Sequence, residues 1–483
     1  MPTDDDITTV PDGTDIAGPK ADALEALARL FGDRFSRAQA VRTHHANSIT
    51  WHKPELPDAV IFPLSVDEVQ QAVRICSAAA LPIIAYGSGT SLEGQINASF
   101  GGVTFDLSRM NNIIAINAED LDCEVEAGVT RLQLNSDLRD KGLFFPIDPG
   151  ADTTIGGMAA TRASGTNAVR YGTMRENVVS VTAVLANGTL IKTGNRARKS
   201  SAGYDLTRLL VGSEGTLAII TSVVVRLQGI PEKITAAVLP FETLDGACNT
   251  AIATIQLGLP IARIELIDEM QVKISNAYSR LSLAETPTLF VEFHGSEASV
   301  AEQVAQFREI AEEFGAQSFD MAEQPEDRSK LWQARHDTYW ATSAWRPGSQ
   351  VLTTDACVPI SRLADCIAET RKDLDQHGLI GPIIGHIGDG NFHVTLLFDG
   401  DDAAEIAKVK AFVDRLSHRA VAMEGTCTGE HGIGQGKLVA LLHELGPAVD
   451  VMRAIKRALD PKNIMNPGKI FHAVPAAAEG DHQ

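Results

Sequence analysis

The chain has 483 residues, of which 44% are hydrophobic and 22% charged. This length exceeds what one hydrophobic core usually supports, so we expect two or three packed units. Its formal net charge of −20, from 62 acidic and 42 basic side chains, argues against nucleic acid or an anionic membrane surface as a binding partner.

The N-terminal sequence, MPTDDDITTVPDGTD, lacks the basic, apolar or arginine-rich character of a signal or transit peptide. No apolar run approaches the roughly 20 residues of a membrane-spanning helix, so we expect a cytoplasmic protein without a transmembrane segment. The six cysteines include no C-x-x-C pair and no cluster suited to structural zinc or to an iron–sulfur centre. Reduced thiols are therefore expected, and redox chemistry would need another carrier.

Elements of mixed type follow one another in the first half of the chain. The pattern ADALEALARLFG predicts a helix within an N-terminal segment, residues 1–52. Residues 57–89 then have the pattern of strand, amphipathic helix, strand and glycine-rich turn, and short strands follow in GGVTFDLS, IIAIN and DCEVEAG. The Asn-Gly turn in SVTAVLANGTLIKTG predicts a hairpin. A Gly-Ile-Pro break then ends a first unit, residues 53–230.

The second half of the chain alternates predicted strands with long predicted helices. ITAAVLPF, TLFVEFHG, QVLTTDACVP and HVTLLFD have strand character, and helical stretches such as ASVAEQVAQFREIAEEFG separate them. This alternation predicts a second domain, residues 231–440, in which helices pack over one sheet. The tail, residues 472–483, is expected to be disordered.

Three glycine-rich segments are candidates for cofactor binding. The first, AYGSGTSLEGQ at 85–95, follows an apolar strand, and its glycines let backbone N–H groups approach a phosphate. Its spacing matches neither the dinucleotide-binding pattern G-x-G-x-x-G nor a Walker loop, so alone it is equally compatible with a tight turn. Residues 146–172 and 199–221 are similar segments, and three together favour one large flat ligand over three unrelated loops.

A family resemblance appears when the motifs are taken in order. Y-G-S-G-T-S-L-E-G, P-x-D-P-G-A-x-x-T-I-G-G and A-G-Y-D-L-T-R-L-L-V-G-S-E-G-T-L resemble the FAD-binding domain of the vanillyl-alcohol oxidase and p-cresol methylhydroxylase superfamily. With G-H-x-G-D-G-N-F-H, G-E-H-G-I-G and N-P-G-K-I, residues 50–471 resemble the FAD-linked 2-hydroxyacid dehydrogenases, especially the cytochrome-type D-lactate and the D-2-hydroxyglutarate enzymes. The resemblance implies an α+β fold. It would comprise an FAD-binding domain of that superfamily, an α/β cap domain with helices over an antiparallel sheet, and a C-terminal segment, 441–471, that returns to the FAD domain.

The resemblance also implies which residues bind FAD. The pyrophosphate is expected on the first glycine-rich segment, at Gly87, Ser88, Gly89, Thr90 and Ser91, with Gly94 nearby. The flavin and its chain are expected against the other segments, at Pro149, Thr154, Gly156, Gly157, Ser164, Gly165, Tyr171, Gly215, Ile220 and, from the C-terminus, Asn466. Residues 85–95 contain no histidine for covalent attachment, so non-covalent FAD is expected.

Two histidines in GHIGDGNFHV are candidate metal ligands. His386 and His393 would face opposite sides of a straight strand, but the glycines between them permit a turn that brings both rings to one point. Each could equally be an ordinary hydrogen-bonded residue. Together with Glu430 of GEHG they form a common three-ligand set for a divalent metal, and we favour that interpretation.

The resemblance assigns chemical roles around this set. It implies zinc or manganese at the three ligands and His431 as the catalytic base, and a histidine with its unperturbed pKa of about 6.5 suits that task near neutral pH. A metal that chelates a 2-hydroxy acid would lower the pKa of its hydroxyl and position C2 for hydride transfer to flavin N5. Asn391 is expected to orient substrate or a ligand, with an Asx-type turn as the alternative.

A substrate carboxylate would suit an arginine, whose planar guanidinium can form two parallel hydrogen bonds to it. The stretch LWQARHDTYWATSAWRPGSQ offers Arg335 and Arg346; the resemblance assigns the role to Arg335, whereas Trp332 has the pattern of a core residue. In the D-2-hydroxyglutarate enzymes a lysine just before a D-x-x-x-P segment helps to hold the second carboxylate. VLTTDACVP has no lysine, which favours monocarboxylic acids with small apolar side chains.

The sequence therefore predicts an FAD-dependent D-2-hydroxyacid dehydrogenase, with D-lactate to pyruvate as the favoured reaction and D-2-hydroxyglutarate or glycolate as rival substrates. A flavin-binding subunit of a larger electron-transfer complex is the alternative from another class. The sequence has no haem motif, so the acceptor is expected to be external: a cytochrome, a quinone or an electron-transfer flavoprotein. Loose membrane association through that acceptor and a homodimer both remain open.

Overall fold

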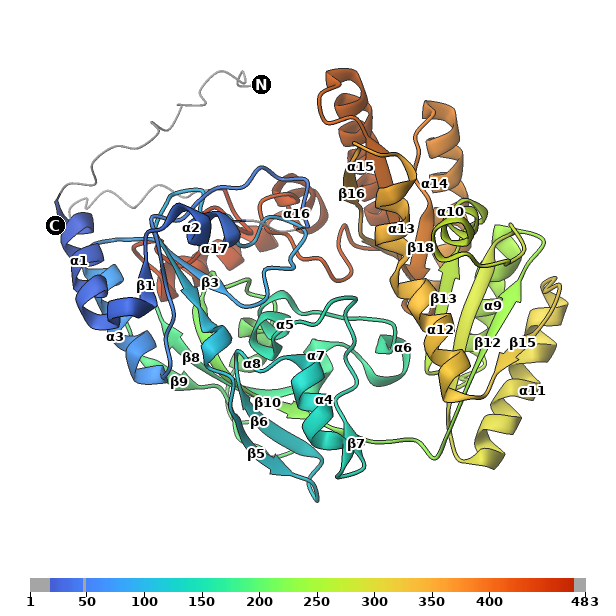
Figure 1. Cartoon of the computed structure of the whole chain (residues 1–483), viewed down its shortest axis with the longest axis horizontal. Coiled ribbons are helices and arrows are strands. Elements are labelled where there is room, and N and C mark those ends of the chain that lie inside the picture. Colours follow the sequence, from blue (N-terminus) through green and yellow to red (C-terminus); the bar gives the residue numbers. More distant parts are fainter. Residues whose placement is uncertain (1–17, 47–48, 473–483) are drawn as a thin grey trace.

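The computed structural model describes residues 18–46 and 49–472, which form two domains side by side (Figure 1). The first domain contains the N-terminal half and the last helices of the chain, and the second contains the segment between them. Two predictions fall outside the described residues. The absence of a targeting peptide concerns residues 1–17, and most of the expected disordered tail is residues 473–483. None of the helices in the described ranges is long and apolar enough to cross a membrane.

The first domain begins with a four-stranded sheet covered by two amphipathic helices. The strands lie in the order β1 (Phe35–Ser36), β2 (Ala59–Ile61), β4 (Val103–Asp106) and β3 (Ile83–Tyr86), and β2, β4 and β3 are parallel. The covering helices are α1 (Pro19–Phe31) and α3 (Val66–Ala78). Ser65 caps α3 by accepting a hydrogen bond from Glu68 N. Helical spacing then places Val69, Val73 and Cys76 against the sheet.

A five-stranded antiparallel sheet forms the rest of this domain. Its order is β5 (Ile113–Asn117), β6 (Asp122–Glu126), β10 (Ala218–Arg226), β8 (Val178–Leu185) and β9 (Leu190–Lys192). The predicted Asn-Gly hairpin joins β8 to β9, and Gly188 at its turn has φ +78°. Strand β10 is buried on both faces, with Ile219 in one core cluster and Ile220 in another, which explains its unbroken apolar sequence.

Short elements connect these two sheets. The helices are α2 (Gln39–His44), α4 (Arg131–Arg139), α5 (Ile155–Thr161), α6 (Ala168–Tyr171), α7 (Met174–Asn177) and α8 (Leu206–Leu210). A two-stranded ribbon of β7 (Leu143–Phe144) and β11 (Gln228–Gly229) lies where the chain leaves the domain. The second and third glycine-rich segments supply α5, α6 and α8, so their backbones are held by packing against this sheet.

The second domain is one sheet whose strand pairs are all antiparallel. Its order is β15 (Asp320–Ala322), β12 (Lys233–Pro240), β14 (Thr288–Gly295), β13 (Arg263–Ile267), β18 (Ile383–His386), β19 (Asn391–Phe398) and β16 (Gln350–Thr353), and β17 (Ala356–Cys357) also pairs with β19. One face packs in a large core against α9 (Leu244–Gln256), α11 (Glu297–Glu313), α14 (Leu363–His377) and α15 (Ala403–Ala422).

The other face of this sheet is turned toward the first domain. Here lie α10 (Glu269–Ser279), α12 (Pro325–His336) and α13 (Thr338–Trp345), and Figure 1 shows α12 and α13 between the sheet and the first domain. Val272 and Trp332 pack with Phe290 and Ile384 of the sheet in a small separate core. The sheet is therefore covered thickly on its outer face and only partly on the face where the two domains meet.

The C-terminal helices α16 (Leu438–Leu445) and α17 (Ala448–Leu459) rejoin the first domain. Beyond α17, Ile83 N donates to Ile464 O at 2.7 Å and Asn466 N donates to Ile83 O at 2.8 Å, which extends the parallel sheet at β3. Lys456 fixes the same segment through hydrogen bonds to Thr216 O at 2.8 Å and Met465 O at 2.7 Å. The connection between α15 and α16, residues 423–437, thus passes from one domain to the other.

Candidate active site

A cavity of about 360 Å³ lies between the two domains. Its wall in the first domain is formed by the three glycine-rich segments and Asn466, and its wall in the second by side chains of α12, α13, β18 and β19. Glu430 and His431, from the connection 423–437, complete the lining. Segments that are far apart in the sequence therefore line one cavity, of a size typical for small-molecule sites.

Most of the residues expected to bind FAD line this cavity: Gly87, Ser88, Gly89, Thr90, Ser91, Pro149, Thr154, Gly157, Ser164, Gly165, Gly215 and Asn466. Gly156 and Ile220 line a smaller cavity whose wall also includes Gly87, Gly157 and Gly215. Two expected residues lie elsewhere. The hydroxyl of Tyr171 donates to His294 Nδ1 at 2.8 Å, and Gly94 packs against the side chain of Gln435.

The local geometry of these segments fits a large ligand held by backbone atoms. A Cβ atom at Gly87 would lie 2.2 Å from Thr154 Oγ1, and Gly89 and Gly215 have φ values of +66° and +72° that favour glycine. Asn466 donates through Nδ2 to Gln95 O at 3.0 Å and to Glu214 O at 2.7 Å. Its Oδ1 is buried without a hydrogen-bond partner among the described residues, so it can accept from a ligand.

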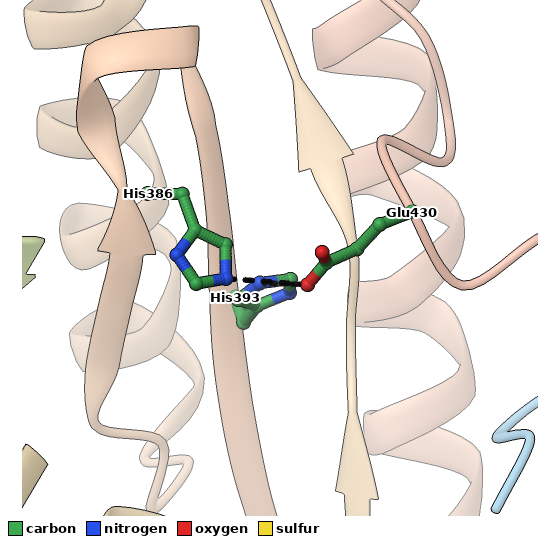
Figure 2. A group of neighbouring side chains, drawn as sticks. All are labelled: His386, His393 and Glu430. Atoms are coloured by element: carbon green, nitrogen blue, oxygen red, sulfur yellow. Dashed lines mark ion pairs between the residues drawn. The ribbon is translucent and has the colours of Figure 1, made fainter. Parts of the chain in front are cut away.

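His386, His393 and Glu430 converge at the other end of the cavity (Figure 2). The two histidines come from the hairpin of β18 and β19, in which Ile384 pairs with His393 and His386 with Asn391. Gly390, at φ +75°, ends the short turn between the strands, and a Cβ there would lie 2.1 Å from Val358 O. This turn brings the two imidazole rings to 5.4 Å between centroids, at 81°.

The ligand atoms of this cluster all point to one place. Glu430 Oε1 lies 3.3 Å from His386 Nε2 and 3.2 Å from His393 Nε2, and the three ligand atoms lie within 4.8 Å of one another. The other ring nitrogens are already used, because His386 Nδ1 donates to Glu265 at 2.7 Å and His393 Nδ1 donates to Thr354 O at 3.0 Å. Both Nε2 atoms therefore face Glu430 and are the ring nitrogens available to a metal.

Charge within the cluster follows from these contacts. Burial alone would lower the pKa of His386, but Glu265 and Glu430 raise it well above its usual value. Burial alone would raise the pKa of Glu430, but His386 and His393 bring it well below the usual range. Glu430 is therefore ionised at neutral pH, the form in which a carboxylate ligates a cation.

His431 lies beside the cluster but is oriented differently. Its ring stacks on His393 at 4.9 Å between centroids and 8° between planes, and its Nε2 lies 4.0 Å from Glu430 Oε1. Burial lowers the pKa of His431 to about 4, and its Nδ1 has no hydrogen-bond partner among the described residues. His431 thus lines the cavity as a neutral imidazole.

Comparisons with known proteins agree with this arrangement. Residues 57–194 match the FAD binding domain family, and residues 230–470 match the family described as FAD linked oxidases, C-terminal domain. The chain is 51% identical over 469 residues to a probable mitochondrial D-lactate dehydrogenase of Danio rerio, covering 95% of this chain and 94% of that protein.

The chain belongs to the FAD-linked oxidase family.

Further relatives and solved structures extend the match. A mitochondrial cytochrome-type D-lactate dehydrogenase of Arabidopsis thaliana is 46% identical, covering 87% of this chain and 75% of that protein. Glycolate oxidase subunit GlcD of Bacillus subtilis is 33% identical, covering 93% and 97%. Among solved structures, 4-ethylphenol oxidase from Gulosibacter chungangensis has a TM-score of 0.78 at 19% identity, covering 97% of this chain and 99% of that chain. For p-cresol methylhydroxylase the TM-score is 0.77 at 18% identity, with 96% and 99% covered.

These matches confirm the predicted family, the α+β fold of the p-cresol methylhydroxylase type and an FAD-linked oxidoreductase. Below, the first domain, which contains residues 57–194, is called the FAD domain, and the second is called the cap domain. The expected cytoplasmic location receives no support, because both D-lactate dehydrogenases are described as mitochondrial.

Asn391, which was expected to orient substrate or a ligand, is not among the residues that line the cavity. It donates through Nδ2 to Asp355 Oδ1 at 2.7 Å and to Ala356 O at 2.9 Å, so its side chain does not form a local Asx turn either. Asp355 Oδ2 in turn accepts from the backbone N–H groups of Glu430 and His431, each at 2.9 Å. Asn391 therefore holds Asp355, the carboxylate that fixes the backbone of Glu430 and His431.

Arg335 lines the cavity, as expected, but it is already paired. Its Nη2 donates to Glu265 at 2.6 Å, while its buried Nε has no hydrogen-bond partner among the described residues. Arg346 lies on the surface, paired with Glu405 at 3.0 Å. Trp332 is buried and donates to Glu292 at 2.6 Å, in agreement with its interpretation as a core residue.

Glu265 was missed by sequence reasoning. It lies on β13, whose sequence RIELI is short and was not recognised as a strand. The signal was available, because Arg263 and Glu265 alternate with the apolar residues Ile264 and Leu266, and a carboxylate within a strand of a central sheet is unusual. Asp355 was missed as well, although it stands in the segment VLTTDACVP where a lysine was sought.

Lys437 links the two domains at the end of the connection 423–437. Its buried Nζ lies 3.3 Å from Glu93 Oε1 of the FAD domain and 3.9 Å from Asp355 Oδ2 of the cap domain. Burial alone would lower the pKa of Lys437, but Glu93 and Asp355 raise it. One ammonium group is thus the shared counter-charge of two buried carboxylates.

Replacing Lys437 by Met is expected to destabilise the protein, because two buried carboxylates lose their counter-charge. The free energy of unfolding should fall by about 3–5 kcal/mol, measured by urea denaturation of the protein with FAD bound. As a control, Lys233→Met removes a partly exposed pair with Glu323 at 3.0 Å and should cost less than about 1 kcal/mol. Equal effects of the two substitutions would contradict the assigned role of Lys437.

Proposed function

We propose that this protein oxidises D-lactate to pyruvate with non-covalent FAD, at a divalent metal held by His386, His393 and Glu430. The observation that carries the proposal is the convergence of two histidine Nε2 atoms on Glu430 Oε1, at 3.3 and 3.2 Å, inside a cavity lined by the glycine-rich segments. The names of the relatives, at 51% and 46% identity, support D-lactate as the substrate.

The donor set fits a dication with a small coordination shell. Two neutral imidazoles and one carboxylate are common ligands of zinc and manganese, and they leave positions open for substrate oxygens. Bound there, the metal would supply Lewis-acid chemistry by lowering the pKa of the substrate hydroxyl. Glu265 and Thr354 accept from the second nitrogens of the two histidines and so fix the orientation of each ring.

His431 is the group best placed to take the hydroxyl proton. It is a neutral imidazole at the cavity wall, one residue from a metal ligand, and its ring plane is fixed by stacking on His393. Asp355 holds its backbone N–H at 2.9 Å, and its carbonyl oxygen accepts from Gln95 Nε2 at 2.8 Å. FAD supplies the hydride acceptor, and the glycine-rich segments with Asn466 would hold it against the same cavity.

Substrate selection would follow from the charge of the lining. Arg335 is the one arginine or lysine among the described residues that line the cavity, and its guanidinium suits the carboxylate of a 2-hydroxy acid. Side chains near it, Tyr339, Trp340 and Thr353, are neutral. A second carboxylate would therefore be buried without a cation, which favours D-lactate over D-2-hydroxyglutarate.

The electrons would leave to an external acceptor. The name of the Arabidopsis relative contains the word cytochrome, which favours a cytochrome as acceptor over a quinone or a flavoprotein. The net charge of −20 would attract a basic partner at low ionic strength.

The substrate is tested by anaerobic bleaching of bound flavin with a panel of hydroxy acids. D-lactate should bleach the flavin, and D-2-hydroxyglutarate should do so at least about tenfold more slowly. Faster bleaching by the dicarboxylate, by glycolate or by L-lactate would contradict the substrate. If none of these acids bleached the flavin with metal present, the alternative of a flavin-binding subunit of a larger complex would stand instead.

A further inference from the structure

Glu265 connects two functional groups that sequence reasoning treated separately. It lies on β13 and is fully buried, with a side-chain exposure of 0%. Its Oε1 accepts from His386 Nδ1 at 2.7 Å, and its Oε2 accepts from Arg335 Nη2 at 2.6 Å. The two oxygens of one carboxylate thus hold a metal-ligand candidate and a substrate-carboxylate candidate.

The backbone around Glu265 leaves little freedom for this contact. Strand β13 lies inside the sheet between β14 and β18, with Leu266 opposite Gly385 and Ile267 opposite Ile384. Glu265 and His386 are therefore next to each other along neighbouring strands. Since both neighbouring strands are hydrogen-bonded to β13, the carboxylate is set by the sheet and not by a loop.

The chemistry of a carboxylate explains why this position suits glutamate. An ionised carboxylate only accepts hydrogen bonds, so the ring nitrogen of His386 that faces it must carry a proton. The other ring nitrogen, Nε2, faces Glu430 at 3.3 Å and is the one that a metal would bind. On the other side, the bond to Nη2 fixes the guanidinium of Arg335, a residue that lines the cavity.

We propose that Glu265 is a positioning residue that ties metal binding to recognition of the substrate carboxylate, by fixing His386 and Arg335 at the same time. The inference rests on the proposed function, because it concerns the metal and substrate of that site. It goes further by making metal affinity and the Michaelis constant depend on one side chain that touches neither metal nor substrate.

An amide at this position cannot serve both partners. If the oxygen of the introduced amide accepted from His386, its NH₂ group would face the donor Nη2 of Arg335. If the amide were turned around, its NH₂ group would donate to His386 Nδ1 and move the ring proton to Nε2, where it would block ligation. Glu265→Gln therefore disturbs one contact or the other, whereas Glu265→Asp keeps an acceptor for both.

The test uses FAD-loaded protein from which divalent metal has been removed, titrated with Co²⁺ and followed by the d–d absorbance of the bound ion. Glu265→Gln should lower the Co²⁺ affinity by about 10- to 100-fold and raise the Michaelis constant for D-lactate. Glu265→Asp should recover part of both losses. Unchanged Co²⁺ affinity in folded, FAD-bound Glu265→Gln protein would overturn the inference.

Glu292 offers a matched control on the neighbouring strand β14. It is also a buried carboxylate bonded to a histidine, His294 Nε2 at 2.7 Å, and it also faces an arginine, Arg263 Nε at 3.5 Å. Its histidine is not part of the metal cluster. Glu292→Gln should lower stability without weakening Co²⁺ binding, and an equal loss of Co²⁺ affinity in both variants would reduce the role of Glu265 to general structural support.

The inference and the proposed function fail in different ways. Suppose that Glu265→Gln protein binds Co²⁺ more weakly than wild type, but D-lactate bleaches the flavin of neither protein. The positioning role then holds, and the assigned substrate is wrong. If D-lactate bleaches the wild-type flavin and Glu265→Gln binds Co²⁺ as tightly as wild type, the function holds and the positioning role is wrong.

Discussion

Replacing His431 by Asn is expected to slow flavin reduction by D-lactate by about 10²- to 10⁴-fold, the usual contribution of a general base. The cause is the loss of the ring nitrogen that would accept the hydroxyl proton at the cavity. Asn retains the backbone N–H that donates to Asp355 and the carbonyl that accepts from Gln95. Stopped-flow absorbance of the flavin under anaerobic conditions measures the effect directly.

The content of FAD and of metal should be unchanged in this variant, because His431 is not one of the three converging ligands. His418→Asn, at an exposed histidine on α15, serves as the control and should reduce the flavin at the wild-type rate. A His431→Asn enzyme with metal bound and the wild-type rate of reduction would show that the proton leaves to another group.

Replacing His393 by Ala should remove the metal and, with it, most of the activity. Only His386 and Glu430 would remain as ligands, and the substrate would lose the Lewis acid, whose contribution of several kcal/mol corresponds to about 10²- to 10⁴-fold in rate. Metal analysis of the purified variant should give background values while flavin absorbance shows that FAD is retained. FAD should be retained because His393 does not belong to the glycine-rich segments that line the FAD side of the cavity.

Stability is the main confounding factor for this variant, since His393 is buried. His294→Ala, which removes another buried histidine outside the cluster, controls for it. The control should lose stability yet keep its metal and its rate of flavin reduction. Retention of stoichiometric metal in folded His393→Ala protein would contradict the assigned ligand set.

Local sequence patterns predicted much of the fold because they report local physics. The apolar period of α1 and α3, the Asn-Gly turn at Gly188 and the alternation of strands and helices in the cap domain all appear in the structure. Pairing of strands that are distant in the sequence is not a local property. The order β13-β18 in the cap sheet, which places Glu265 beside His386, could not be read from the chain.

The same distinction applies to the candidate site. The turn at Gly390 was anticipated from glycine spacing, and the structure brings His386 and His393 together as that spacing permits. Asn391 was expected to orient substrate or a ligand, and its side chain pairs with Asp355, 36 residues away in the sequence. Buried carboxylates such as Asp355 act through partners from other segments, so a linear motif gives little indication of them.

The dependence of flavin reduction on a divalent metal tests the central claim most directly. Protein that has been stripped of metal with a chelator, with removal verified by elemental analysis and FAD retained, should no longer be bleached by D-lactate under anaerobic conditions. Bleaching should return when Zn²⁺ or Mn²⁺ is added back, and should remain absent in His393→Ala protein treated in the same way. Flavin reduction by D-lactate at an unchanged rate after verified metal removal would contradict the account.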